Sequence, residues 1–420
     1  MALRDPIQEF FNSFYMFQTS EGPSSPAHQF LFTGTSAPVK PNDQYGYYLD
    51  FVADAQQGTD YFGCQHAGPG MEWVYPNGTL TPDPLDSECW AHDTLVTAAA
   101  DCQNGYCDRP GVTWGYYGPS GTALSIWDAP GANPQTCYGQ ASPPPAYPTA
   151  CYNWPGTEYG DHVHLSGQNG YSDAPIFDDL YGCKLPMISY VIPDQQWSDH
   201  PYQSGKSSSL SLGPYWVGDI INAVGTACSG KYWSGSEPTA IFVVWDDWGG
   251  WYDHIPPWAY YRGTSTSCTG YAPNNWGCGY VSGFRVPFLV VSAWTGTQTQ
   301  NGVTNYVSGA CSPSTCPNYG QNNVYVHDFG SILAFTEWNF NFSPKTIDWA
   351  DKGYADYNAP DWGPGGAGNP SNVPLMDFFG LSQPRQFGPI STTPYPYTCF
   401  TNWGNCPLQA SYQPEDPDDY

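Results

Sequence analysis

The stretch Thr239-Ala-Ile-Phe-Val-Val-Trp-Asp-Asp-Trp-Gly-Gly-Trp-Tyr-Asp-His-Ile-Pro-Pro257 decides the fold class, because it joins a buried strand to a group of acids. Its apolar run, Ala240 to Trp245, has the length of one β-strand and ends directly at Asp246 and Asp247. Two carboxylates at the carboxyl end of a buried strand offer anionic oxygens from a rigid edge, which suits a hard divalent cation. We therefore predict a metal or phosphate-handling site here; the alternative is a solvated strand end without chemistry.

Strands and helices alternate along much of the chain. Apolar runs predict strands at 185–193, 239–245 and 285–293, and helical patterns predict helices at 5–18, 214–224 and 327–340. Continuous apolar strands separated by helices favour an α/β fold with a largely parallel sheet. We expect one domain over residues 1–380 and a Pro- and Asp-rich tail over residues 381–420.

The region from about residue 60 to residue 182 is rich in Gly, Pro, Tyr and Cys and has few periodic segments. It is predicted to be a loop-rich insertion or lid that disulfides hold together. The 14 cysteines are even in number and contain no Cys-x-x-Cys pair, so disulfides are expected rather than a zinc ribbon. Disulfides indicate an oxidising compartment, and we expect a secreted or periplasmic protein.

The charge balance excludes one class of partner. The chain has 11 basic and 38 acidic residues and a net charge of −27, which argues against binding to nucleic acid. No run of 18 or more apolar residues is present, so no transmembrane segment is expected. Transient contact with a membrane surface stays open. A phosphorylated substrate also stays open, because a bound metal can reverse the local field.

Hydroxyl groups follow Gly22-Pro23 on what reads as a constrained turn after a helix. A serine there, Ser24, can act as a nucleophile when a metal activates it, without a Ser–His dyad. Taken alone, the segment is more often an ordinary Ser-Pro loop than a catalytic one, and His28 is more often a surface or packing residue.

Two acid–imidazole pairs stand near the predicted strand ends. Asp199 and His200 follow the 185–193 strand, so they are expected at the same sheet edge as the Asp246–Asp247 pair. His200 could act as a general acid for a leaving oxygen or hold a phosphate. The second pair, Asp253 and His254, follows the Gly-Gly turn.

Two other motifs favour structural interpretations. Asp161-His162-Val-His164 has metal-like spacing, but its loop-rich surroundings favour a solvated turn. Asp328-Phe-Gly330 imitates a kinase motif without the other kinase motifs, so Asp328 is interpreted as a helix-start residue. The sequence has no Walker loop, GxGxxG or GxSxG motif.

Together these segments resemble the phosphoesterase family of bacterial and fungal phospholipases C and acid phosphatases. Residues 16–36 resemble that family's nucleophile block, in which the Ser or Thr after Gly-Pro attacks phosphorus, and residues 245–257 resemble its metal-binding block. Asp199-His-Pro201 and residues 283–292 match further elements of the family.

The resemblance implies an alkaline-phosphatase-like three-layer α/β/α sandwich. It implies in-line attack by Ser24, a phosphoserine intermediate, and its hydrolysis by water. Asp246 and Asp247 would hold a divalent metal ion whose identity the sequence does not specify, and His200 would bind or protonate the leaving side. His28 and His254 would line the substrate pocket, which would take a phosphate ester or a phospholipid.

One departure from the family separates two functional outcomes. The family normally begins with a strand that carries a Glu-Asn pair completing the metal site, and this chain has no Glu-Asn pair. We therefore expect an N-terminally shortened member with a weakened metal site. The alternative is a catalytically impaired homologue that acts as an extracellular binding protein. A sulfatase is disfavoured, because the Cys/Ser-x-Pro-x-Arg motif is absent.

Overall fold

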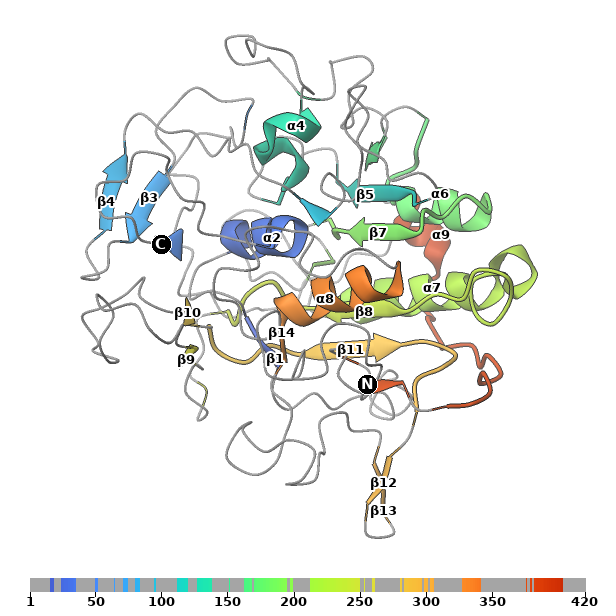
Figure 1. Cartoon of the computed structure of the whole chain (residues 1–420). Helices are drawn as coiled ribbons and strands as arrows, with labels where there is room; N and C mark the ends of the chain where they lie inside the picture. Colours follow the sequence, from blue (N-terminus) through green and yellow to red (C-terminus); the bar gives the residue numbers. More distant parts are fainter. Residues whose placement is uncertain are drawn as a thin grey trace.

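The protein contains both helices and strands, and the computed structural model describes residues 16–18, 24–34, 50–51, 64, 71–74, 80–83, 94–95, 112–119, 127–137, 151, 162–167, 170–194, 197–198, 212–249, 253, 259–260, 280–281, 283–296, 298–300, 303–305, 327–340, 375, 378–379 and 381–402. The strands are β1 (Met16–Phe17), β2 (Asp50–Phe51), β3 (Met71–Val74), β4 (Leu80–Asp83), β5 (Trp114–Gly118), β6 (Val163–Leu165), β7 (Ile188–Val191), β8 (Ile241–Val244), β9 (Ala259–Tyr260), β10 (Tyr280–Val281), β11 (Phe288–Val291), β12 (Gln298–Gln300), β13 (Val303–Asn305) and β14 (His327–Asp328). The helices are α2 (Ser24–Thr33), α4 (Pro134–Cys137), α6 (Pro175–Tyr181), α7 (Gly213–Thr226), α8 (Phe329–Asn339) and α9 (Tyr397–Phe400), with 3-10 turns η3 (Pro130–Ala132) and η5 (Ala227–Gly230) (Figure 1).

The strands form open sheets of two or three strands with mixed direction. Strands β6, β5 and β7 are parallel, and so are β1 and β14. Strands β8 and β11 are antiparallel, with Val244 opposite Phe288. The predicted strands at 185–193, 239–245 and 285–293 are therefore confirmed. The expectation of a largely parallel sheet is wrong for β8 and β11, because a continuous apolar run predicts a buried strand but not the direction of its partner.

Part of the region predicted as an insertion or lid belongs to the core. Strand β5 lies between β6 and β7, with Trp114 opposite Ile188 and Tyr116 opposite both Val163 and Tyr190. The side chains of Trp114 and Tyr116 are buried. These aromatic residues show no alternation with polar ones, so the period-2 signal of a half-buried strand is absent from their sequence. A disulfide between Cys137 and Cys151 holds the α4 segment.

Side chains of the strands point alternately into two apolar clusters. In β11, Phe288 and Val290 join one cluster and Val291 joins the other; in β5, Tyr116 and Tyr117 divide in the same way. This alternation follows from the two-residue period of a strand. The strands are therefore covered by apolar side chains on both faces.

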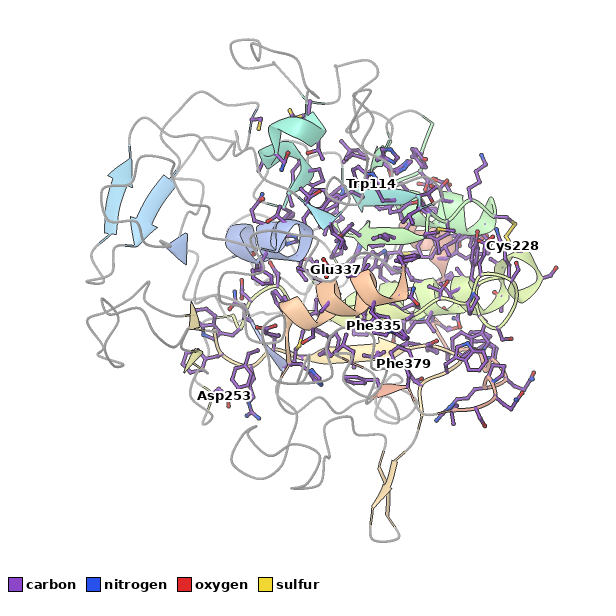
Figure 2. All side chains as sticks on the ribbon, in the orientation of Figure 1. Trp114, Cys228, Asp253, Phe335, Glu337 and Phe379 are labelled. Carbon is purple, nitrogen blue, oxygen red and sulfur yellow. A yellow bond between two sulfur atoms is a disulfide. The ribbon has the colours of Figure 1, made fainter. Side chains whose placement is uncertain are left out.

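Different helices supply the two clusters. Helices α2 and α8 pack against each other and contribute to the first cluster, whereas α6, α7 and α9 contribute to the second (Figure 1). Aromatic rings link the layers of the first cluster: Phe335 of α8 packs edge-on to Phe242 of β8 at 5.4 Å and stacks on Phe379 at 5.1 Å (Figure 2).

The longest helices have the start signals that their sequences predict. Pro214 stands in the first turn of α7, where its missing N–H removes no hydrogen bond. Asp328 is the N-cap of α8, and its backbone N–H donates to Ser331 Oγ at 3.0 Å. The helix-start interpretation of Asp328 is thus confirmed.

The predicted helix at 5–18 is wrong at its end. Residues 5–15 lie outside the described residues, and Met16 and Phe17 form strand β1. Both side chains are buried, and β1 pairs with β14 and bridges to Arg285. This strand depends on partners more than 260 residues away, which a local pattern of apolar residues does not reveal.

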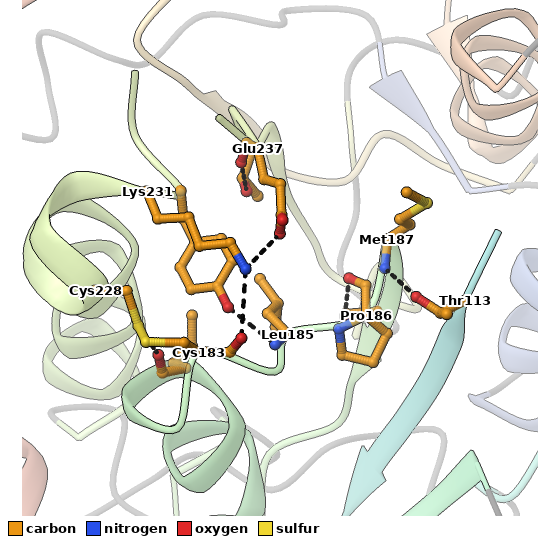
Figure 3. Close-up of polar contacts among 12 residues, drawn as sticks. Thr113, Cys183, Leu185, Pro186, Met187, Cys228, Lys231 and Glu237 are labelled. Carbon is orange, nitrogen blue, oxygen red and sulfur yellow. Dashed lines mark hydrogen bonds and ion pairs between the residues drawn. A yellow bond between two sulfur atoms is a disulfide. The ribbon is translucent and has the colours of Figure 1, made fainter. Parts of the chain in front are cut away.

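A group of polar contacts fixes the connection that leads into β8 (Figure 3). Cys183 and Cys228 form a disulfide, and Lys231 Nζ contacts both Cys183 O at 3.3 Å and Glu237 Oε2 at 2.9 Å. The Leu185 N–H donates to the hydroxyl of Tyr232 at 3.1 Å. The segment after α7 is thereby attached to the segment that precedes β7.

Residues 381–402 pack onto α7 and contribute Ile390, Tyr395 and Phe400 to the second apolar cluster. The Asn222 side chain forms two hydrogen bonds of 2.8 Å with the backbone of Ile390, and Trp233 Nε1 donates to Arg385 O at 2.7 Å. A Cβ atom at Gly225 would lie 2.2 Å from the ring of Phe387, so only glycine allows this close approach.

Asp219 lies beneath this segment and makes the stability of the fold depend on pH. Its side chain is buried on α7; burial raises the pKa of Asp219 to about 7 from the usual 3.8, although a hydrogen bond with Thr392 acts in the opposite direction. Since the folded-state pKa is the higher one, the native state binds more protons than the unfolded state between about pH 4 and pH 7. The free energy of unfolding should therefore fall as pH rises through this window.

The substitution Asp219→Asn should remove this contribution, because an amide does not titrate. We expect the variant to gain stability over the parent at pH 7 and to show a smaller difference at pH 4, measured by urea unfolding at both values. Asp173→Asn, which removes an exposed carboxylate, serves as the control. The same pH dependence in the parent and in Asp219→Asn would contradict this explanation.

Candidate active site

The carboxylate pair lies where the sequence places it, directly after β8. Strand β8 ends at Val244, and Trp245 separates it from Asp246 and Asp247. The Asp246 side chain is 33% exposed, so the pair borders the apolar core on one side and remains accessible to a ligand on the other. The antiparallel partner β11 holds the strand and thus fixes the origin of both carboxylates.

Helix α2 brings a hydroxyl and an imidazole to these carboxylates. Ser24 is the first residue of α2 and His28 stands four residues later, so both lie on the same face of the helix. Ser24 Oγ lies 3.5 Å from Asp247 Oδ2, and His28 Nε2 lies 3.3 Å from Asp246 Oδ2. Ser24 and His28 are more than 200 positions away from Asp246 and Asp247 in the chain. The fold therefore brings four predicted site residues from two distant segments together.

The structure corrects the local conformation predicted for the serine segment. Residues 24–26 belong to a helix and not to a turn, so Ser24 stands at the N-terminus of α2. The N–H groups of the first helical turn have no partner within the helix and create a positive potential there. This position favours an anion beside Ser24, which a turn by itself would not do.

The protonation of Asp246 reflects these neighbours. Burial raises the pKa of Asp246, but the hydrogen bond and charge of His28, with a hydrogen bond from Ser24, outweigh this effect. The pKa of Asp246 lies well below its usual range as a result. The Asp246 side chain is therefore an anionic carboxylate near neutral pH.

A backbone contact orients the second carboxylate. The N–H of Gly249 donates to Asp247 Oδ1 at 2.5 Å. Gly249 has a φ of 68°, a left-handed conformation that costs a residue with a Cβ about 1–2 kcal/mol. The first glycine of the Gly-Gly turn thus positions one oxygen of Asp247, while the other oxygen faces Ser24.

The Asp253 side chain forms an ion pair with Arg285. Arg285 Nε donates to Asp253 Oδ2 at 2.6 Å, and Arg285 Nη2 donates to Asp253 Oδ1 at 2.7 Å. Figure 2 shows Asp253 at the end of the molecule away from Cys228. The sequence motifs assign no role to Arg285. The signal that could have found it is an arginine at the start of an apolar strand, in a chain with only 11 basic residues.

The residues present fit a divalent cation in part. Ser24 and Asp247 offer oxygens 3.5 Å apart, and oxygens that share a cation at about 2.0–2.6 Å are separated by a comparable distance. Carboxylate and hydroxyl oxygens are hard ligands, which favour magnesium, calcium or manganese. Within the described ranges, no group of three or more His, Cys, Asp or Glu side chains is placed to hold a metal. Groups other than these side chains would have to complete the coordination.

Some predicted site residues cannot be placed. Asp199, His200 and His254 lie outside the described residues. The motif of His162 and His164 is not a solvated turn, because each ring stacks on an aromatic residue of β5 at a centroid distance of 4.4 Å and 4.9 Å, respectively. Burial lowers the pKa of His164.

Each helix in the described part of the chain is too short or too polar to cross a membrane.

Comparison with known proteins places the chain in a family. No curated protein sequence matches it. Residues 8–343 match the phosphoesterase family, and this range includes both Ser24 and the Asp246–Asp247 pair. Because the match covers most of the 420 residues and agrees with the motifs quoted above, the chain belongs to the phosphoesterase family.

Proposed function

We propose that this protein hydrolyses phosphate esters with Ser24 as the nucleophile and with a divalent metal ion bound by Asp246 and Asp247. The observation that carries the proposal is the meeting of Ser24 with both carboxylates at the N-terminus of α2. Membership of the phosphoesterase family supports the reaction class. The metal and the phosphoserine intermediate are part of the proposal.

The reaction would proceed in two displacements. The hydroxyl of Ser24 loses its proton as Oγ bonds to phosphorus; the bond from phosphorus to the leaving oxygen breaks, and that oxygen takes up a proton. Water then attacks the phosphoserine, which releases phosphate and returns the proton to Ser24. A bound divalent ion would supply a lower pKa for the hydroxyl and neutralisation of the phosphoryl oxygens.

The chain's own residues would prepare these steps. Asp247 accepts a contact from Ser24 and so holds the hydroxyl toward the carboxylate pair. The N-terminus of α2 favours the negative charge of a phosphoryl group next to Ser24. His28 contacts Asp246 and lies one helical turn from Ser24, so we assign it to substrate binding. His254 is assigned the same role and His200 the protonation of the leaving oxygen, both from their sequence motifs.

The substrate type and the location are also proposals. Phospholipase C and acid phosphatase activities both agree with this site, and substrate tests must separate them. Two disulfides, Cys137–Cys151 and Cys183–Cys228, support secretion or a periplasmic location. The second candidate function is an extracellular binding protein that has lost catalysis, since the described oxygen ligands would leave coordination positions to other groups.

The fold proposed with this function is a three-layer α/β/α sandwich of the alkaline-phosphatase type. Its support is the division of side chains from β5 and β11 between two apolar clusters with different helices. In such a sandwich the carboxyl ends of the strands and the following loops carry the site, as Asp246 and Asp247 do after β8.

Replacement of the nucleophile tests the mechanism directly. Ser24→Ala should lower kcat for p-nitrophenyl phosphate and for phosphatidylcholine by roughly 10³-fold or more, since removing a nucleophile leaves only residual catalysis. Ser189→Ala removes a half-buried hydroxyl from β7 and should keep the parent rate. Full turnover by Ser24→Ala would refute the mechanism. A folded parent without turnover on either ester would favour the binding protein.

Gly249 tests the contribution of the turn after β8. Gly249→Ala should lower stability by about 1–2 kcal/mol and weaken Mn²⁺ binding, because alanine disfavours the conformation that directs the N–H to Asp247. Gly167→Ala is a matched control: its φ is 67° and a Cβ there would meet no atom within 4 Å. It should cost similar stability in urea unfolding and leave Mn²⁺ affinity unchanged in calorimetry. Equal Mn²⁺ affinities for both variants would contradict a role for the turn.

A further inference from the structure

The segment 283–291 connects the two halves of the candidate site. Its first part pairs with β1: Gly283 N donates to Gln18 O at 2.8 Å, Gln18 N donates to Phe284 O at 3.0 Å, and Val286 N donates to Met16 O at 2.9 Å. Its second part is β11, which pairs with β8. One continuous backbone therefore joins the strand that precedes Ser24 to the strand that precedes Asp246.

Arg285 stands at the junction of these pairings. Its backbone bridges to Phe17 of β1, and its side chain reaches the segment that follows the carboxylate pair, where it binds Asp253 through two hydrogen bonds of 2.6 Å and 2.7 Å. A two-point contact between a guanidinium and a carboxylate fixes orientation as well as distance. The side chains are only 19% and 15% exposed, so water screens the contact less than it would on an open surface.

The ion pair with Arg285 gives Asp253 a different role from that of Asp246 and Asp247. Asp253 is the third acid within eight residues, and repulsion among three carboxylates would oppose their close approach. Because Asp253 is bound to Arg285, its charge is neutralised locally. Asp246 and Asp247 are left as the anionic pair that faces Ser24 and His28.

From these contacts we infer that Arg285 is a positioning residue, which acts through Asp253 to restrict Gly249 and thereby the orientation of Asp247 toward Ser24. The inference rests on the proposed phosphoryl transfer for its effect on rate. Its effect on Gly249 does not require that function. Groups that orient the ligands of a metal typically change metal affinity by 10- to 100-fold when they are lost.

The experiment compares Arg285→Ala, Arg285→Lys, Asp253→Asn and the double variant Arg285→Ala/Asp253→Asn in the full chain. The first readout is the hydrogen exchange of the Gly249 amide in metal-free protein, since this N–H binds Asp247. The second is the dissociation constant for Mn²⁺ by calorimetry, and the third is kcat and KM for p-nitrophenyl phosphate. Arg385→Ala, on the segment that packs against α7, is the control for removal of an arginine.

We expect Arg285→Ala to speed exchange of the Gly249 amide, to raise the Mn²⁺ dissociation constant about tenfold or more, and to lower kcat with little change in KM. Arg285→Lys should recover only part of each effect, because an ammonium cannot make the two-point contact. The double variant should be no worse than Arg285→Ala, because both substitutions break one interaction. Arg385→Ala should match the parent in all three readouts.

Two results from the exchange and Mn²⁺ measurements would overturn the inference. One is a loss of stability in urea for Arg285→Ala with unchanged Gly249 exchange and Mn²⁺ affinity, which would leave Arg285 a structural role only. The other is additive effects of the two single substitutions on Mn²⁺ affinity. A parent that lacks turnover, with Gly249 exchange and Mn²⁺ affinity still dependent on Arg285, would refute the proposed function and keep this inference. If the parent is active and Arg285→Ala keeps its full turnover, the proposed function would stand and this inference would be refuted.

Discussion

The site depends on the repulsion between two adjacent carboxylates at the end of an apolar strand. Such a pair is costly next to a hydrophobic core unless hydrogen-bond donors or positive charge offset it. Here two elements supply three donors: Ser24 and His28 from α2, and the Gly249 N–H from the turn after β8. A cation would complete the compensation. The same requirement therefore explains both the proximity of α2 to β8 and the chemistry proposed for them.

The aromatic core gives these elements their fixed positions. Phe242 of β8 packs between Phe288 of β11 at 6.0 Å and Phe335 of α8 at 5.4 Å. Helix α8 in turn packs on α2, which carries Ser24. Large rings have few rotatable bonds and bury much area, so they transmit a fixed spacing between layers. The distance from Ser24 to Asp247 thus depends on the packing of these layers as well as on the turn after β8.

Charge is distributed unevenly between the bulk of the protein and the site. With a net charge of −27, the chain would repel an anionic substrate at long range, so local positive groups must favour a phosphate at the site. Among the described residues, the N-terminus of α2 and His28 could do so, and a bound cation would add to their effect. Arg285 serves a different purpose, because its charge is used on Asp253. Positive groups are few in this chain, and those near the site have separate tasks.

Local sequence was sufficient for the elements that have strong periodicity or clear ends. The strands β7, β8 and β11, the helices α7 and α8, and the N-cap Asp328 were all predicted, because apolar runs, Pro214 and a capping residue act over a few positions. The pair Asp246–Asp247 and the candidate nucleophile Ser24 were also recognised from their motifs, which match the family found for residues 8–343. Contacts between distant segments were outside the reach of such patterns.

Tertiary structure decided the rest. Met16 and Phe17 became a strand through pairing with β14 and Arg285, and Trp114 and Tyr116 became a core strand through pairing with β6 and β7. The antiparallel direction of β8 and β11 and the ion pair of Arg285 with Asp253 have the same origin. The sequence by itself determined which residues could do chemistry and where most elements begin. Only the folded chain decided which of them meet, because strand pairing and charge pairing join residues that are far apart in sequence.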